Sequence, residues 1–174
     1  SNSIFRVAAV VPLTGPYEMY GRSLLAGLVI GVEEQNRRNL IPMRVVAYDS
    51  EGNAWTAAHR AEQALNEGAG ILVGAALSVP TLTLAGIAEA RGVPLFSPAA
   101  SEERVAEIGD VVYQTGLSEL EQGRALARYA VSDLRLARIA IAGDEGGIGS
   151  NLAAGFRDQA ETWEAVTIPV QSPA

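Results

Sequence analysis

The sequence predicts a doubly wound α/β fold built on a parallel sheet. Short apolar segments with few charges alternate along the chain with longer segments in which apolar residues recur at helical spacing. Strands that are buried on both faces of a parallel sheet have this nearly uncharged character. Their alternation with helices is typical of strand–helix–strand units, in which each helix returns the chain to begin the next parallel strand.

The first lobe is expected to span residues 1–118. Its expected strands are residues 5–12, 43–49, 71–74, 93–96 and 111–115. Its expected helices, each placed between two of these strands, are residues 21–38, 54–67 and 79–91. Each helix is long enough to cross back over the sheet, so the order of elements agrees with the predicted fold.

A second α/β unit is expected to begin at residue 119 and to occupy residues 119–174. Its expected helices and strands are, in chain order, residues 120–134, 138–142, 150–161 and 165–170. Ser150 is the expected N-cap of the second of these helices. Two parallel strands with their helices do not cover both faces of a sheet, so we expect an incomplete lobe and a natural chain that continues beyond Ala174.

Composition excludes several classes of function. The net charge of −7 and the pI of about 4.7 argue against binding of nucleic acid, which needs a concentrated basic face. The chain has no cysteine, which excludes disulfides and thiolate nucleophiles, and no lysine, which excludes a Schiff base. No apolar run reaches the length of a membrane span. We expect neither a metal nor a cofactor.

The loop over residues 14–21 is the strongest candidate for a binding site. In open parallel sheets, ligands bind outside the carboxyl ends of the strands, which is where this loop lies. It matches neither of the glycine-rich phosphate-binding patterns. Thr14, Tyr17 and Tyr20 offer groups that form hydrogen bonds and stack without reacting. A well-packed turn with a half-buried tyrosine explains the same residues equally well.

Catalytic residues are not evident, and we expect the protein not to be an enzyme. The single histidine, His59, lies within an expected helix and is better explained as a solvated or capping residue. Asp49 lies in DSEGN, which lacks the downstream glutamate and acidic spacing of a calcium loop. We expect its carboxylate to meet amides at a helix N-terminus. Asp144 and Glu145 are flanked by glycines and favour a solvated turn.

Several segments, taken in order, resemble one known family. They are PLTGPYEMYG, GVEEQN, VVAYDSEGN, ILVGAALSVPT, GVPLFSPAAS and IAIAGDEGGIGSNLAAGF. Together they resemble the type I periplasmic solute-binding proteins, above all the branched-chain amino-acid receptors of ABC transporters. The resemblance implies a two-lobed clamp that closes on an amino acid or a related carboxylate. It also implies a periplasmic or extracellular location, with a lipid anchor as one option, and the transporter's membrane subunits as partners.

The resemblance also implies ligand-binding positions in the first lobe. Tyr20 matches a tyrosine that lines the cleft of the family. Ser78 and Val79 match the loop whose serine hydroxyls and amides hold the carboxylate of the ligand. Ala99 matches a residue whose carbonyl accepts from the ligand ammonium group, and the adjacent Ala100 is also an expected ligand-binding residue.

Two further ligand-binding positions are implied later in the chain. Ser101 stands where the family has a threonine that contacts both the ammonium group and the carboxylate. Ile148 stands where the second lobe of the family supplies a tyrosine. Val79 and Ile148 both depart from the family pattern, and the missing hydroxyl of Val79 predicts weaker binding of a standard amino acid, since a hydrogen bond to a charged group contributes roughly 1.5–3 kcal/mol.

A second function remains open. The short link RRNLIPMR and the DSEGN segment also resemble a group of envelope proteins that regulate peptidoglycan synthases, in which this fold binds another protein. In the first expected helix, a broad apolar stripe should lie mostly in the core, and any exposed part is a candidate homodimer contact. The stripe consists of Leu24, Leu25, Leu28, Val29 and Val32.

Overall fold

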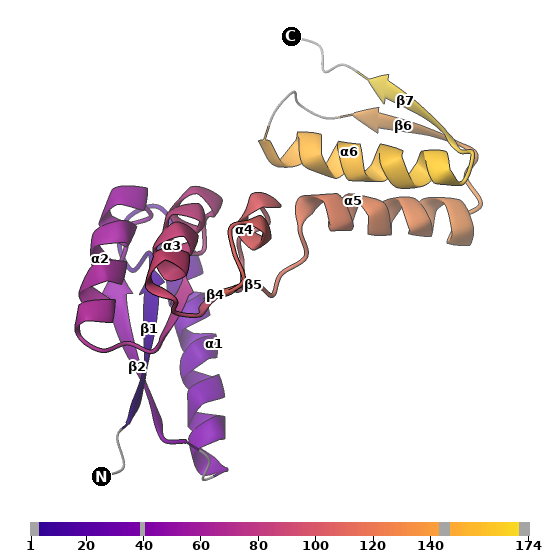
Figure 1. The fold of residues 1–174 in the computed structure, drawn as a ribbon. Helices are drawn as coiled ribbons and strands as arrows, with labels where there is room; N and C mark the ends of the chain where they lie inside the picture. The colour runs from indigo at the N-terminus through magenta and orange to yellow at the C-terminus, as the bar shows by residue number, and fades with distance from the viewer. Residues whose placement is uncertain (1–3, 39–40, 143–146, 171–174) are drawn as a thin grey trace. The chain divides into compact units, whose positions relative to one another are not determined.

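The chain divides into two compact units (Figure 1). The computed structural model describes residues 4–38, 41–142 and 147–170. Unit 1 consists of Ser1–Ala100 and Arg104–Gly116, and unit 2 consists of Ser101–Glu103 and Leu117–Ala174. Each unit contains its own parallel strands and its own apolar cluster.

Unit 1 is built on a parallel sheet of five strands in the order β2-β1-β3-β4-β5. The strands are β1 (Phe5–Val11), β2 (Met43–Asp49), β3 (Ile71–Gly74), β4 (Leu95–Ser97) and β5 (Val112–Gln114). The order reverses between β1 and β3, as it does in doubly wound sheets. The predicted fold class is therefore confirmed, and every expected strand of the first lobe is present within two residues of its expected bounds.

Helices cover the two faces of this sheet unequally. The helices of unit 1 are α1 (Glu18–Arg37), α2 (Ala54–Asn66), α3 (Ser78–Arg91) and the short α4 (Arg104–Glu107). In Figure 1, α2 and α3 lie on one face of the sheet and α1 lies on the other. The buried core lies between the sheet and the α2/α3 layer, where Leu72, Leu84 and Leu95 are fully buried.

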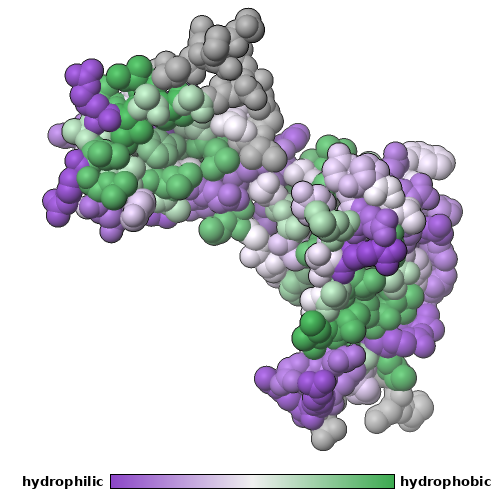
Figure 2. Space-filling view, turned by 180° about the vertical axis from the view of Figure 1, so that it is seen from behind, coloured by the Kyte–Doolittle hydropathy of each residue, from purple (hydrophilic) through white to green (hydrophobic). Residues whose placement is uncertain are grey.

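The apolar stripe of α1 is not part of that buried core, contrary to the prediction. Its five residues are only partly buried, and Gly21 is the one residue of α1 that is classed as buried. Ile30 on the same helix is 68% exposed. Figure 2 shows hydrophobic surface on this side of unit 1. The reason is that α1 lies mainly against β1 and β2, and no described helix is seen beside it on that face.

The start of α1 moves one binding residue out of its expected loop. The helix begins at Glu18, three residues earlier than predicted, so Tyr20 lies in its first turn. Gly21 allows this close packing, because a Cβ atom there would lie 1.8 Å from the carbonyl oxygen of Pro12. The backbone of α1 can therefore lie directly against the end of β1.

Unit 2 consists of a parallel strand pair and two packed helices. Its elements are α5 (Glu119–Arg128), a π-helical turn (Tyr129–Asp133), β6 (Arg138–Ala142), α6 (Gly147–Thr162) and β7 (Val166–Val170). The helix predicted over residues 120–134 therefore changes its hydrogen-bonding pattern after Arg128. Ser150 lies within α6 and not before it, so its predicted role as the N-cap is wrong.

Two glycines bring α5 and α6 unusually close. A Cβ atom on Gly123 would lie 2.1 Å from the carbonyl oxygen of Leu152, and one on Gly155 would lie 2.2 Å from that of Leu120. Backbone therefore packs against backbone at both positions. The small buried side chains of Ala127 and Ala160 continue this close contact along the helix pair.

Candidate functional site

The loop between β1 and α1 is held by a carboxylate from the neighbouring strand. Asp49, the last residue of β2, accepts hydrogen bonds from the Leu13 amide (2.8 Å), the Thr14 hydroxyl (2.7 Å) and the Glu51 amide (2.9 Å). These amides belong to the two loops and not to a helix N-terminus, so the predicted partner of Asp49 is corrected. The carboxylate thereby joins the ends of β1 and β2.

Hydrogen bonding also determines the charge state of Asp49. Burial opposes ionisation of the carboxyl group, but the hydrogen bonds from the Thr14 hydroxyl and from the loop amides outweigh it and lower the pKa of Asp49. The group is therefore a structural anion that fixes the loop. Thr14 is committed to this contact and Tyr20, with 57% of its surface exposed, is the accessible residue of the segment.

The loop between β3 and α3 presents backbone amides that have no acceptor among the described residues. The residue before α3 is Leu77, whose side chain cannot cap a helix, and no side-chain hydrogen bond caps this N-terminus. Ser78 and Val79 are the first two residues of the helix, so their amides have no acceptor within it. Ser78 is partly buried, whereas the Val79 side chain is 66% exposed. This end of α3 therefore offers hydrogen-bond donors to an anion.

A buried threonine in α3 also holds this loop in place. The Thr81 side chain is fully buried. Its hydroxyl accepts from the Ala75 amide at 2.9 Å and donates to the Leu77 carbonyl at 2.8 Å. The sequence did not predict this role, because nothing in the local pattern distinguishes a threonine in the first turn of a helix that bonds to the preceding loop from one that does not.

The end of β4 presents an acceptor. Ala99 is exposed, and its carbonyl oxygen receives no hydrogen bond from the described residues. Ala100 differs, because it is buried and its carbonyl accepts from the Gln114 side chain at 2.7 Å. Strands β3 and β4 are neighbours in the sheet. The structure therefore brings Ser78, Val79 and Ala99 to the carboxyl ends of adjacent strands. Ala100 has a structural role instead, because its carbonyl is already bonded to the Gln114 side chain.

Ser101 lies in unit 2 and is joined to a buried glutamate. The Ser101 hydroxyl donates to one carboxylate oxygen of Glu119 at 2.8 Å, and the Glu119 amide donates to the Ser101 carbonyl at 3.1 Å. The Asn151 amide group donates to the other carboxylate oxygen at 2.8 Å. Glu119 is only 5% exposed. Sequence reasoning missed Glu119, because glutamate in the first turn of a helix is ordinarily solvated.

Some predicted residues lie beyond what the structure describes. The backbone of Ile148 lies in the first turn of α6, but its side chain is outside the described residues, as are Asp144 and Glu145. His59 is exposed on α2. Among the described residues, no group of three or more potential metal ligands occurs, and no helix is long and apolar enough to cross a membrane.

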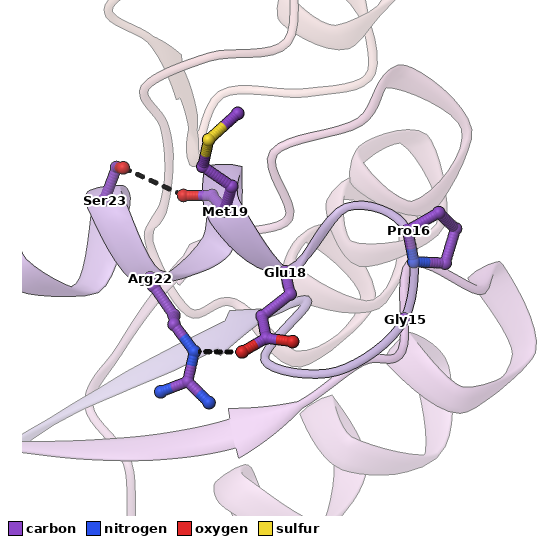
Figure 3. Close-up of a pocket in the computed structure, with 6 residues that line it drawn as sticks. All are labelled: Gly15, Pro16, Glu18, Met19, Arg22 and Ser23. Carbon is purple, nitrogen blue, oxygen red and sulfur yellow. Dashed lines mark hydrogen bonds and ion pairs between the residues drawn. The ribbon is translucent and has the colours of Figure 1, made fainter.

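A shallow surface pocket of about 520 Å³ lies at the first turns of α1 (Figure 3). It is lined by Gly15, Pro16, Glu18, Met19, Arg22 and Ser23. Two of these lining residues, Glu18 and Arg22, form an ion pair. Tyr20, Ser78 and Ala99 do not line this pocket, so it is separate from the cluster at the ends of β3 and β4.

Comparison with known proteins identifies the family. A family model described as "Periplasmic binding protein" matches residues 5–167. The chain belongs to this family. Membership places it among binding proteins and not among enzymes, and the topology of unit 1 agrees with the type I form of the fold.

Periplasmic binding proteins for branched-chain amino acids are among the relatives. The Leu/Ile/Val-binding protein of Escherichia coli K12 is 27% identical over 157 residues, which are 88% of this chain and 43% of that protein. The chain thus spans less than half of the length of this relative. Its relatives are receptors of this kind, which does not favour the envelope-regulator alternative.

Solved structures show the same fold with two kinds of ligand. A substrate-binding protein from Desulfitobacterium hafniense in complex with Leu superposes with a TM-score of 0.82 at 21% identity, over 99% of this chain and 51% of that one. A solute-binding protein from R. palustris in complex with 4-hydroxybenzoate superposes with a TM-score of 0.77 at 18% identity, over 98% of this chain and 47% of that one.

Proposed function

We propose that this chain belongs to a solute-binding protein that captures a small polar ligand, an amino acid or a related carboxylate, for uptake by an ABC transporter. The observation that carries the proposal is the pairing of opposite hydrogen-bonding groups in unit 1. The first amides of α3 and the Ser78 hydroxyl lie at the start of that helix, and the Ala99 carbonyl lies at the end of the adjacent strand. Within the part of the chain that the structure describes, these amides and this carbonyl have no hydrogen-bond partner.

This arrangement matches the two charged groups of an α-amino acid. A helix N-terminus stabilises an anion through its amides and its dipole, so α3 would hold the carboxylate. A carbonyl oxygen accepts from an ammonium group, so Ala99 would hold the amine. Neighbouring strands lie roughly 4.8 Å apart, a separation that one small zwitterion spans. Tyr20 adds an exposed aromatic ring, which would pack on an apolar side chain of the ligand.

The departures from the family pattern affect affinity and not the mode of binding. Val79 offers its amide but no hydroxyl, so one hydrogen bond to the carboxylate is absent. A bond of this kind contributes roughly 1.5–3 kcal/mol, which is about tenfold or more in affinity. We therefore expect a standard branched-chain amino acid to bind more weakly than it does where the family has a serine at this position.

The remaining parts of the proposal concern the whole protein. Unit 1 is the first lobe, and unit 2 begins the second. The ligand draws the lobes together, and the closed form is recognised by the membrane subunits of the transporter. The protein acts in the periplasm or outside the cell, with a signal or lipid anchor as its means of export and attachment. The family membership and the names of the relatives support these statements.

Calorimetry on the full-length protein with aliphatic amino acids tests the proposal. Ser78→Ala and Tyr20→Ala should each weaken binding by about tenfold while the melting temperature without ligand stays near that of the wild type. Thr83→Ala is the matched control, because its hydroxyl lies one turn further along α3 and donates to the Val79 carbonyl. Unchanged affinity in both site variants would remove the basis of the assignment.

A further inference from the structure

Tyr17 is the part of the first loop that the proposed function leaves unexplained. It precedes α1 and keeps 41% of its surface exposed, although its ring packs against a neighbouring loop. A Cβ atom on Gly52 would lie 2.8 Å from Cδ2 of this ring and 3.7 Å from Cε2. One edge of the ring is therefore held by backbone, which restricts its rotation, while the rest is accessible.

The same ring lies near the residue that precedes α3. The Leu77 side chain comes within 3.5 Å of the Cβ position of Gly52, so Tyr17 and Leu77 both approach one point of the backbone. Glycine suits this point, because its φ of +69° and the crowding around it both disfavour a side chain. Tyr17 therefore joins the loops at the carboxyl ends of β1, β2 and β3.

The order of the strands places Tyr17 and Ala99 on opposite sides of the start of α3. Strand β3 leads into α3, and it lies between β1 and β4 in the sheet. Tyr17 follows β1, whereas Ala99 follows β4. A ligand whose carboxylate is held at the start of α3 therefore has a carbonyl acceptor on one side and the Tyr17 ring on the other.

We propose that Tyr17 is a specificity-determining residue that selects a ligand with an aromatic ring. This inference rests on the proposed function and narrows it to aromatic amino acids and related aromatic carboxylates. Two aromatic rings attract each other, in offset-stacked or edge-to-face arrangements, beyond what the buried area contributes. An aliphatic side chain gains the buried area alone. The restrained ring of Tyr17 thus favours an aromatic side chain over an aliphatic one of similar size.

A matched pair of probes tests the selection in the full-length protein. L-Phenylalanine carries an aromatic ring, and L-cyclohexylalanine has the same carbon skeleton with a saturated ring. The saturated ring is the more apolar of the two, so burial alone favours L-cyclohexylalanine. Calorimetry should show instead that the wild type binds L-phenylalanine about threefold to tenfold more tightly, which is the range that an aromatic pair contributes.

Three variants assign this preference to the Tyr17 ring. Tyr17→Phe should keep it, because the ring remains and the phenol hydroxyl has no partner among the described residues. Tyr17→Leu should abolish it while the melting temperature without ligand stays close to that of the wild type, since leucine still covers Gly52. Tyr113→Leu is the matched control and should keep the preference, because this exposed tyrosine of β5 stacks on Phe96 of β4.

The outcomes separate this inference from the proposed function. If the wild type binds L-cyclohexylalanine at least as tightly as L-phenylalanine, or if the preference survives in Tyr17→Leu, the inference is wrong. If the wild type binds L-leucine but neither probe, the inference also fails, whereas the capture of an amino acid stands. If a folded wild type binds no amino acid and no carboxylate, the proposed function fails and the inference fails with it.

Discussion

At the scale of single residues, the Asp49 carboxylate determines the geometry of the first loop. It accepts three hydrogen bonds from Leu13, Thr14 and Glu51, and these bonds lower its pKa despite partial burial. A carboxyl group whose pKa is lower in the folded state stabilises the fold above its unfolded pKa, near 4. That contribution is lost as the pH falls through the folded value.

Asp49→Asn should therefore destabilise unit 1 at neutral pH by about 1–2 kcal/mol, because hydrogen bonds to a charged acceptor are weakened. The difference from the wild type should shrink as the pH is lowered below about 4, since the wild-type carboxylate is then protonated as well. Urea unfolding at several pH values measures both effects. Asp110→Asn, which removes an exposed carboxylate, should show little change; a pH-independent difference at Asp49 would contradict this account.

Tyr48 gives a second prediction at this scale. Burial, together with a hydrogen bond of 2.6 Å to the ionised Glu67, raises the pKa of Tyr48 to about 12. The folded state then holds the phenol proton more tightly than the unfolded state, whose pKa is about 10. The stabilisation is complete below pH 10 and is lost between about pH 10 and pH 12.

Tyr48→Phe should cost about 1 kcal/mol at neutral pH and should remove this alkaline loss. Phenolate absorbance during an alkaline titration provides the direct measurement. One of the five tyrosines should ionise late in the wild type, and this late step should be absent in the variant. A late step that persists in Tyr48→Phe would assign the raised pKa to another tyrosine.

At the scale of elements, close helix packing in unit 2 depends on two glycines. A methyl group at Gly123 or Gly155 would collide with backbone atoms of the opposite helix, at 2.1 and 2.2 Å. Gly123→Ala and Gly155→Ala should each destabilise the protein by about 1–3 kcal/mol, although alanine is the better helix former. Thermal or urea unfolding followed by circular dichroism measures this loss.

Helix α1 supplies the matched control for these substitutions. Gly27 and Gly31 are also helical, but a Cβ atom at either position meets nothing within 4 Å. Gly27→Ala should therefore stabilise the protein by up to about 1 kcal/mol through helix propensity alone. If the substitutions in unit 2 are also stabilising, α5 and α6 do not pack as closely as described.

At the scale of the whole molecule, ligand binding should be visible as a gain in stability. A ligand at about 100 times its dissociation constant adds roughly 2.7 kcal/mol to the free energy of unfolding, which raises the melting temperature by several degrees. A thermal-shift screen of the full-length protein against amino acids, small peptides and carboxylates measures this gain. If no compound of the panel raises the melting temperature of a protein that melts cooperatively, a protein-binding role would be favoured over solute capture.

The local pattern of the sequence was sufficient for most of the fold. The bounds of β2, β3 and β6 agree with the prediction to the residue, because strands buried in a parallel sheet are apolar runs bounded by turns. Ends of helices were less predictable. The first turn of α1 begins in a Gly/Pro/Tyr loop because Gly21 packs on Pro12, a contact between segments that no local pattern expresses.

By itself, the sequence determined the fold class, the order of the elements and the family, since each depends on local periodicity or on motifs read in order. Only the tertiary structure decided which groups are accessible and which are committed. Glu119 is buried and bonded to Ser101 and Asn151, and the Asp49 carboxylate is bonded to two loops. The apolar stripe of α1 is only partly buried. The physical reason is that burial and hydrogen-bond partners depend on segments distant in the chain, whereas strand and helix formation depend mainly on neighbours.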